Sequence, residues 1–419
     1  MNFNQRRWLV ISVSLLAYLL VFFQRTALSV LQPDLENAFQ LSAIQFASLA
    51  SVYMYVYALL QIPVGLLVDS IGPKKTTVIG LFLAAAGAAI MAYAPAYHWL
   101  FIGRVLSCIG IAPIFLNTLK LSAEWFKPSE FASLAGITLF VGNFGALLSS
   151  YPLSWLVHIT NWQTSFKVIA LFTYLVAFLA LFFIFDKPSH CGFENHFDSK
   201  PLTWRDTLYG LGLTLSKPAI YLPMAIYSFS LASVLTIQAS WGARMMLTFL
   251  SISKTSAGFV IMFISIGIMT GALISGKLGD KYRKELVLIC FLIPAALLWI
   301  SFFFIQQLSL IWVYAGWMLL LGFSSAGFSL TFSLGKEISG HRFSGIGTAV
   351  VNGSGFIFTA LVQYIYSFVL ESSKTGGNYS SAGFIHGNYI LIISSVSAAV
   401  LAYYVYFQKK GKKKPVPIH

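Results

Sequence analysis

Charged residues are scarce in this chain of 419 residues. Only 10% of them are Asp, Glu, Lys or Arg, whereas a soluble globular domain carries about 25%. The three cysteines, Cys108, Cys191 and Cys290, lie far apart, so neither a disulfide framework nor a metal site is indicated. Hydrophobic residues make up 58% of the chain and include 37 Phe and 20 Tyr. This composition predicts a polytopic helical membrane protein.

Acidic residues are scarcer than basic ones. There are 13 Asp and Glu against 27 Lys and Arg, which gives a net charge of +14. The basic residues lie in short loops and at the chain ends and do not share one face of a soluble domain, so no nucleic-acid partner is expected. No Ser/His/Asp constellation or His-rich metal site occurs within the apolar segments. The sequence therefore predicts a protein of the lipid bilayer that is not an enzyme and has no metal and no cofactor.

Apolar runs recur along the whole chain. A helix needs about 20 predominantly apolar residues to cross a bilayer. Lys and Arg gather in the loops that would share one side with both termini, which predicts that both termini are cytoplasmic. The short loops and compact basic tail are typical of a multi-pass protein of the bacterial inner membrane. The twelve predicted spans are 8–32, 43–68, 77–95, 99–125, 130–157, 164–185, 218–247, 255–278, 286–305, 310–335, 344–370 and 387–407.

A polar interruption divides these spans into two groups of six. It carries histidine, cysteine and acidic residues, but their spacing fits no standard metal site, and a solvated linker is the simpler interpretation. The predicted organisation is an N-terminal six-helix bundle over 1–185, a cytoplasmic linker over 186–217, a C-terminal six-helix bundle over 218–407 and a basic cytoplasmic tail over 408–419.

The two groups repeat a loop motif. Gly-x-Leu-x-Asp occurs at 65–69 after the second span and again at 276–280 after the eighth, each time followed by basic residues. Weak internal symmetry at this scale is typical of transporters whose binding site lies between two repeats near the midplane. On these loops, the spans and the linker, the sequence resembles the major facilitator superfamily over nearly its whole length. The resemblance implies an all-α fold of twelve transmembrane helices in two pseudo-symmetric six-helix bundles.

Three stretches narrow the resemblance within that superfamily. Arg25 with Ser29 and Pro33, residues 57–63 and residues 123–126 resemble the bacterial organic-anion symporters and the phagosomal type of nutrient transporter. A Gly-Pro-rich motif that is common among drug exporters is poorly matched in the fifth span. This mismatch argues against a drug/proton antiporter.

Arg25 places a permanent charge deep in the first span. Such a charge costs at least ~2.5–3.5 kcal/mol on insertion scales, so it faces a protein interior or a wet cavity and marks function. A guanidinium binds a carboxylate or phosphate through two parallel hydrogen bonds, although a structural arginine bound to backbone carbonyls is the alternative. In the organic-anion symporters this arginine contacts the substrate, and by the same resemblance Tyr57, Asn143 and Asn352 would line the cavity.

Further candidate contacts come from spacing and polarity. Tyr53, Tyr57 and Gln61 share one face of the second span at i, i+4 and i+8. Tyrosines suit a cavity for a small polar solute, and packing or lipid contact is the alternative. Asn117 lies in the fourth span, and Asn352 is polar among the glycines of the eleventh.

A second set of polar residues is predicted to serve structure or gating. The resemblance implies that the two motif aspartates are hydrogen-bonded to neighbouring helices at cytoplasmic helix ends and hold the outward-open state. The fourth-span arginine is expected near the outer end of its span, and the lysine one turn before a glutamate is expected to pair with it. A substrate contact is the alternative for both basic residues. The set is Asp69, Asp280, Arg104, Lys120, Glu124 and Arg283.

The usual carboxylate for proton coupling is missing. The organic-anion symporters carry an acidic residue directly before the first-span arginine and another in the fourth span, where this chain has Gln24 and Ile111. No acidic residue is expected near the midplane, and Asp34 and Glu36 lie at the outer end of the first span. We therefore expect either unusual proton coupling or a uniporter or exchanger.

Taken with the resemblance, these features predict a monomeric secondary active or facilitative transporter. It would move a small organic anion, bearing a carboxylate or phosphate, by rocker-switch alternating access, with protons as an optional second partner. An amino acid or small peptide bound through its carboxylate at Arg25 is the alternative substrate. A non-transporting membrane sensor is a remote alternative, because such a protein would be expected to carry a large soluble domain or a long tail.

Overall fold

The computed structural model describes residues 1–194, 204–340, 343–374 and 379–410. Parts of the predicted linker (186–217) and of the predicted tail (408–419) lie outside these ranges. The side chain of Asp69 also lies outside the described part of the structure.

Helices make up the described fold. They are α1 (Phe3–Phe39), α2 (Ala43–Ile71), α3 (Pro73–Ala92), α4 (Tyr97–Ile111), α5 (Ile114–Trp125), α6 (Pro128–Leu148), α7 (Tyr151–Ile159), α8 (Trp162–Phe183), η1 (Pro188–Cys191), α9 (Trp204–Leu215), η2 (Pro218–Ile220), α10 (Tyr221–Thr236), η3 (Ile237–Trp241), α11 (Gly242–Leu250), α12 (Lys254–Lys281), α13 (Lys284–Ile305), α14 (Ile311–Ser325), η4 (Ala326–Ser329), α15 (Leu330–Ser339), α16 (Ser344–Ser372) and α17 (Ser381–Lys410).

The twelve-span prediction is confirmed. Eleven helical stretches among the described residues are long and apolar enough to cross a membrane, and α6 with α7 forms the twelfth. Several spans are built from two helices, such as α4 and α5, which meet around Pro113. The seventh span contains the π-helical segment η3, a kind of local distortion that often occurs at functional sites.

The first helix is longer than predicted. It was expected over 8–32, but α1 runs from Phe3 to Phe39 and contains Pro33. At its start, Asn2 caps the helix by accepting a hydrogen bond from the backbone of Gln5. At its end, Gln40 adopts the left-handed conformation, with φ of 51°. Asp34 and Glu36, near the helix end, therefore belong to α1 and contact neighbouring helices.

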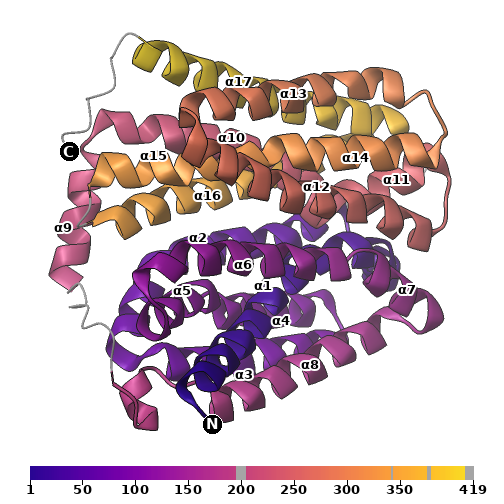
Figure 1. Cartoon of the computed structure of the whole chain (residues 1–419). Helices are drawn as coiled ribbons and strands as arrows, with labels where there is room; N and C mark the ends of the chain where they lie inside the picture. The colour runs from indigo at the N-terminus through magenta and orange to yellow at the C-terminus, as the bar shows by residue number, and fades with distance from the viewer. Residues whose placement is uncertain (195–203, 341–342, 375–378, 411–419) are drawn as a thin grey trace.

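The spans form two groups of helices (Figure 1). The first group, α1–α8, is drawn in the lower half of the figure, and the second group, α10–α17, in the upper half. The beginning of α1, helix α9 and the end of α17 lie toward the same end of the bundle, which we call the terminal face. We call the opposite end, where α1 gives way to α2, the far face.

The first copy of the repeated loop is shaped by a glycine. Gly72 joins α2 to α3 with φ of 96°, a conformation that side-chain-bearing residues rarely adopt. A Cβ at this position would lie 2.9 Å from Oδ2 of Asp186. The other carboxylate oxygen of Asp186 accepts a hydrogen bond of 2.6 Å from the backbone N–H of Lys74, in the first turn of α3. The turn and the end of the sixth span therefore hold each other in place.

The far face holds a hydrophobic core that both groups share. One continuous cluster contains Leu31 and Leu35 of α1, Phe46 of α2, and Trp241 and Met245 of the seventh span. The Phe46 and Trp241 rings lie edge to face with centroids 5.5 Å apart. Burial of this much apolar surface between the two groups favours their contact at the far face. The far face is therefore closed in this structure.

Candidate substrate-binding site

Arg25 lies buried in the middle third of α1. Its side chain is 8% exposed, and its guanidinium carbon lies 3.8 Å from the centre of the Phe22 ring, one turn earlier. Among the described residues, Arg25 takes part in no ion pair, and its Nε has no hydrogen-bond partner. A buried cation without a neighbouring anion is costly. A ring face offsets only a small part of that cost.

Gln24 occupies the position of the missing acid, and its side chain is directed toward α8. Its amide nitrogen donates to the hydroxyl of Thr173 in α8, at 3.3 Å. Its backbone carbonyl accepts a hydrogen bond of 2.7 Å from Nη1 of Arg104. A neutral amide at this position leaves the charge of Arg25 uncompensated.

Arg104 is buried much more deeply than the sequence suggested. It was expected near the outer end of the fourth span, but its side chain is only 2% exposed and reaches inward to the backbone of Gln24. The guanidinium carbon lies 5.2 Å from the centre of the Tyr53 ring, and Nε has no hydrogen-bond partner. Arg104 therefore binds the carbonyl of the residue directly before Arg25, so the two buried arginines are linked through the backbone of α1.

The two predicted tyrosines of α2 lie side by side on the inner side of the first group. Tyr53 and Tyr57 are stacked, with centroids 6.0 Å apart and ring planes 9° from parallel. Both are buried, and the hydroxyl of Tyr53 donates a long hydrogen bond of 3.4 Å to the carbonyl of Val21. Tyr57 also packs edge to face on Phe356 of α16, at 4.7 Å. The second span therefore meets the second group of helices at this depth.

Asn352 is hydrogen-bonded within the second group of helices. Its carbonyl oxygen accepts a hydrogen bond of 2.9 Å from the hydroxyl of Tyr227 in α10. Phe356, four residues later in α16, is the residue that packs on Tyr57 across the boundary between the groups. Tyr227 was not among the residues predicted from the sequence, because a single tyrosine in an apolar span carries no signal of its own. Its ring packs against Phe328 and Phe332.

The other two asparagines are not brought to Arg25 by hydrogen bonds in this structure. The amide nitrogen of Asn143 donates to the carbonyl of Leu139 in its own helix, at 2.9 Å. Asn117 is fully buried, where it accepts from the hydroxyl of Thr76 at 3.0 Å and donates to Thr77 at 2.8 Å. Its amide is therefore engaged with α3 in this structure.

The residues predicted for gating have different surroundings. The carboxylate of Asp280 is exposed at the end of α12 and makes no hydrogen bond or ion pair with another described residue, so the predicted link to neighbouring helices is not made here. Lys120 donates to the carbonyl of Val68 at 3.2 Å, which ties α5 to the end of α2. Glu124 is buried in the same helix. Arg283 pairs loosely with Glu285, with Nε and Oε2 3.9 Å apart.

Polar contacts between the two groups are found at the far face. Lys254 Nζ of α12 lies 2.6 Å from Oδ1 of Asp34 in α1. The hydroxyl of Ser154 donates to the backbone carbonyl of Lys254 at 2.9 Å. Glu371 of α16 accepts a hydrogen bond from the backbone N–H of Ala43, the first residue of α2. These contacts reinforce the apolar closure of the far face.

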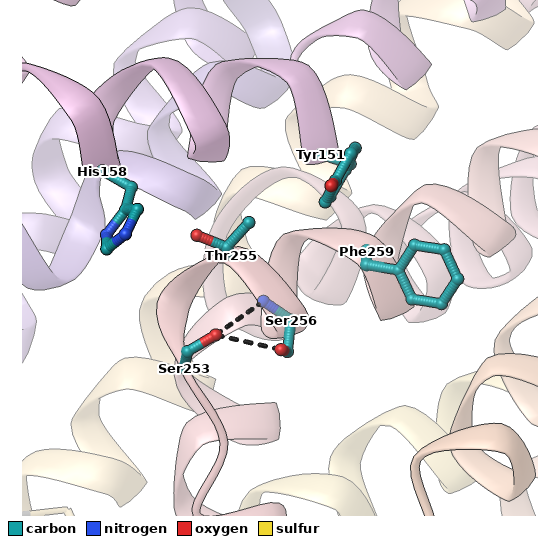
Figure 2. Close-up of a pocket in the computed structure, with 6 residues that line it drawn as sticks. All are labelled: Tyr151, His158, Ser253, Thr255, Ser256 and Phe259. Atoms are coloured by element: carbon teal, nitrogen blue, oxygen red, sulfur yellow. Dashed lines mark hydrogen bonds between the residues drawn. The ribbon is translucent and has the colours of Figure 1, made fainter.

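Pockets at the far face follow the boundary between α7 and α12. One of about 390 Å³ is lined by Tyr151 and His158 of α7 and by four residues at the start of α12 (Figure 2). A second, of about 290 Å³, reaches the Asp34–Lys254 pair. Neither pocket contains Arg25 or the tyrosines that surround it. They mark shallow gaps where the two groups of helices meet.

Comparison with known proteins decides the family. The profile described as Major Facilitator Superfamily matches residues 14–363, most of the chain. This chain belongs to the major facilitator superfamily. The computed fold agrees, because it resembles the crystal structure of a D-xylose–proton symporter with a TM-score of 0.75, 15% identity and coverage of 95% of this chain and 97% of that one. The protein is thus a multi-pass membrane transporter and not an enzyme.

Two curated relatives are bacterial transporters. The hexuronate transporter of Bacillus subtilis (strain 168) is 23% identical over 312 residues, which is 71% of this chain and 72% of the relative. The uncharacterized transporter YybO of the same organism is 28% identical over 163 residues. That match covers 39% of this chain and 38% of YybO. The first of these similarities supports the predicted resemblance to organic-anion carriers.

Proposed function

We propose that this transporter moves a small organic anion and that Arg25 binds the carboxylate or phosphate of its substrate. The observation that carries the proposal is the pair of buried guanidinium groups, Arg25 and Arg104, neither of which pairs with a carboxylate among the described residues; Arg104 binds the carbonyl of the residue directly before Arg25. An arginine that stays charged at every working pH attracts an anion into such a site. The hydroxyls of Tyr53, Tyr57 and Tyr227 and the amide of Asn352 offer neutral hydrogen-bonding groups for the rest of the solute.

The relative described as a hexuronate transporter supports this choice of substrate class. A hexuronate has one carboxylate for a guanidinium and several hydroxyls for neutral partners. An amino acid or small peptide is the second candidate, and its carboxylate would use Arg25 in the same way. Its amine would need an acidic or aromatic partner, and among the described residues no carboxylate pairs with Arg25.

The transport cycle that we propose is rocker-switch alternating access between two six-helix bundles. The closed far face supports it. The two groups are held together at this end by polar contacts and by a shared apolar cluster, and these contacts could separate when the groups move apart. The absence of an acid beside Arg25 favours a uniporter, an exchanger or proton coupling at another residue. We place the protein, as a monomer, in a bacterial inner membrane with both termini in the cytoplasm.

The experiment is ligand-dependent thermal stabilisation of the purified protein, followed by uptake into proteoliposomes. D-glucuronate, D-glucarate, inorganic phosphate and L-alanine represent the candidate classes. A ligand at 100 times its Kd stabilises the folded state by about 2.7 kcal/mol. We expect D-glucuronate or D-glucarate to stabilise the native chain and neither to stabilise Arg25→Gln. Stabilisation by L-alanine alone, or an equal response in the variant, would overturn the proposal.

Uptake then separates the coupling modes. A proton symporter accumulates its substrate above the external concentration when a pH gradient is applied, whereas a facilitative carrier only equilibrates it. The matched control is Lys167→Gln, which removes an exposed cation at the beginning of α8, far along the chain from the site.

A further inference from the structure

A buried charged cluster closes the far face at the end of α1. Oε1 of Glu36 accepts two hydrogen bonds of 2.8 Å, one from the amide of Gln32 and one from the hydroxyl of Tyr379. Nε of Arg244 lies 3.9 Å from Oε2. The guanidinium of Arg244 also lies 5.1 Å from the centre of the Tyr379 ring. We call Gln32, Glu36, Arg244 and Tyr379 the far-face cluster.

The members of the far-face cluster come from both groups of helices. Gln32 and Glu36 belong to α1, Arg244 belongs to α11, and Tyr379 precedes α17. Opening the far face would therefore separate Glu36 from Arg244 and Tyr379. Glu36 is buried, so separating it from Arg244, whose Nε lies 3.9 Å away, would leave a buried carboxylate without its cation, which is costly. The neighbouring Asp34–Lys254 pair is more exposed and contributes less.

The charges around the cluster are divided unequally between the two groups. The first group supplies Asp34 and Glu36. The second group supplies Arg244 and Lys254, while its Lys374 is already paired with its own Glu371 at 3.1 Å and lies 4.7 Å from the Tyr379 ring centre. In the closed state the acids of α1 neutralise the cations opposite them. Once the groups separate, the second group presents a positively charged edge to the far side.

A polar stripe connects this cluster to Arg25. Arg25, Ser29, Gln32 and Glu36 are spaced by four, three and four residues, so they share one face of α1. All four are buried, and Ser29 accepts a long hydrogen bond of 3.5 Å from the backbone N–H of Ala243, next to Arg244. Eleven residues of helix separate Arg25 from Glu36, which is about 16 Å at ~1.5 Å per residue. The stripe therefore runs from the candidate substrate site to the far face along the boundary with the seventh span.

We propose that Arg244 exchanges partners during transport: it pairs with Glu36 while the far face is closed, and it receives the anionic substrate when the far face is open. Glu36 and the substrate then compete for Arg244. When the far face closes, Glu36 pairs with Arg244 again, and the substrate is left with Arg25, the other cation along the stripe. Positively charged residues at the opened far face would also raise the local concentration of anions before they reach the site. The inference rests on the proposed anionic substrate, whereas the cluster itself closes the far face whatever the substrate is.

The test separates these two parts. Spin labels at His98 and Ser309, exposed positions at the far face in the first and second groups, report the opening of that face when Cys108, Cys191 and Cys290 are replaced by serine. Glu36→Gln keeps the shape of the side chain and removes its charge, Arg244→Gln removes the partner, and Tyr379→Phe removes only one hydrogen bond. We expect a roughly tenfold rise in the open population for Glu36→Gln, which removes the charge that Gln32 and Tyr379 hydrogen-bond, and for Arg244→Gln, which leaves buried Glu36 without its cation.

The double variant should open no further than either single variant, because both remove the same pair. Tyr379→Phe should shift the population in the same direction by a smaller factor, and the control Lys167→Gln should not shift it. An unchanged distance distribution in Glu36→Gln, or additive effects of the two substitutions, would overturn the far-face cluster as the closing device.

The second part uses D-glucuronate and sulfate as probes. Each should raise the open population of the native chain, and neither should do so in Arg244→Gln. An equal response of that variant refutes anion binding at Arg244. If sulfate acts on the native chain and D-glucuronate does not, Arg244 is an anion site and the proposed hexuronate-like substrate is wrong. If neither probe acts on the native chain, the exchange of partners is refuted.

Discussion

Replacing Arg25 with methionine tests the central prediction, because stability and binding should change in opposite directions. Methionine has a similar length and is apolar, and its sulfur packs well against an aromatic ring such as Phe22. The substitution removes a buried guanidinium whose Nε has no hydrogen-bond partner. A buried unsatisfied polar group costs about 1–3 kcal/mol. We therefore expect the ligand-free variant to be more stable than the native chain by about that amount.

The same change should abolish substrate binding. Hydrogen bonds to charged groups contribute about 1.5–3 kcal/mol each, and a guanidinium offers two of them to one carboxylate. Their joint loss of roughly 3–6 kcal/mol corresponds to a rise in Kd of at least a hundredfold. Arg25→Lys is the matched variant, since it keeps the charge and removes the planar fork. It should bind with intermediate affinity.

The assays are thermal unfolding in detergent without ligand and calorimetric titration with the substrate identified in the stabilisation experiment. A loss of stability in Arg25→Met of more than about 2 kcal/mol would show that the arginine is a structural element with partners of its own, as for a broken buried pair. Unchanged affinity in Arg25→Met would show that the anion binds elsewhere. Either result would refute the inference from its uncompensated charge.

Three further predictions follow from local geometry. Asn117→Ala should destabilise the protein by about 1–3 kcal/mol, because the buried hydrogen bonds that its amide makes with Thr76 and Thr77 are lost, and the substrate Kd measured by titration should not change. Gly72→Ala should cost about 1–3 kcal/mol in thermal unfolding, because an L side chain is strained at this φ and would collide with Asp186. Asp280→Asn should leave the unfolding temperature within error, since its exposed carboxylate has no partner among the described residues; a clear decrease would show that it makes a structural contact.

The far-face cluster could not be predicted from the sequence. Glu36 and Tyr379 are separated by most of the chain, and they meet only because the two groups of helices close over each other. The sequence predicts that Glu36 lies at the outer end of the first span, but it does not predict which residues Glu36 contacts. The same holds for Arg104, whose contact is a backbone carbonyl. A carbonyl is available at every residue and leaves no signature in the sequence.

Asn117 shows that polarity alone does not identify a substrate contact. A polar residue in an apolar span predicts such a contact, but hydrogen bonds to Thr76 and Thr77 of α3 also account for its burial. Polar side chains inside a helical membrane protein often hydrogen-bond across helices. Only the packing of α3 against α5 distinguishes that use from ligand binding.

The sequence by itself determined the membrane class, the twelve spans, the repeated loop and the uncompensated charge of Arg25. These properties depend on local hydropathy and on where the few acidic residues lie along the chain. Both can be read from the sequence without knowing which residues are neighbours in space. The tertiary structure decided which charges meet. It brought Arg104 to Tyr53, engaged Asn117 with α3 and paired Glu36 with Arg244, because side-chain interactions extend only a few ångströms and depend on how distant segments pack.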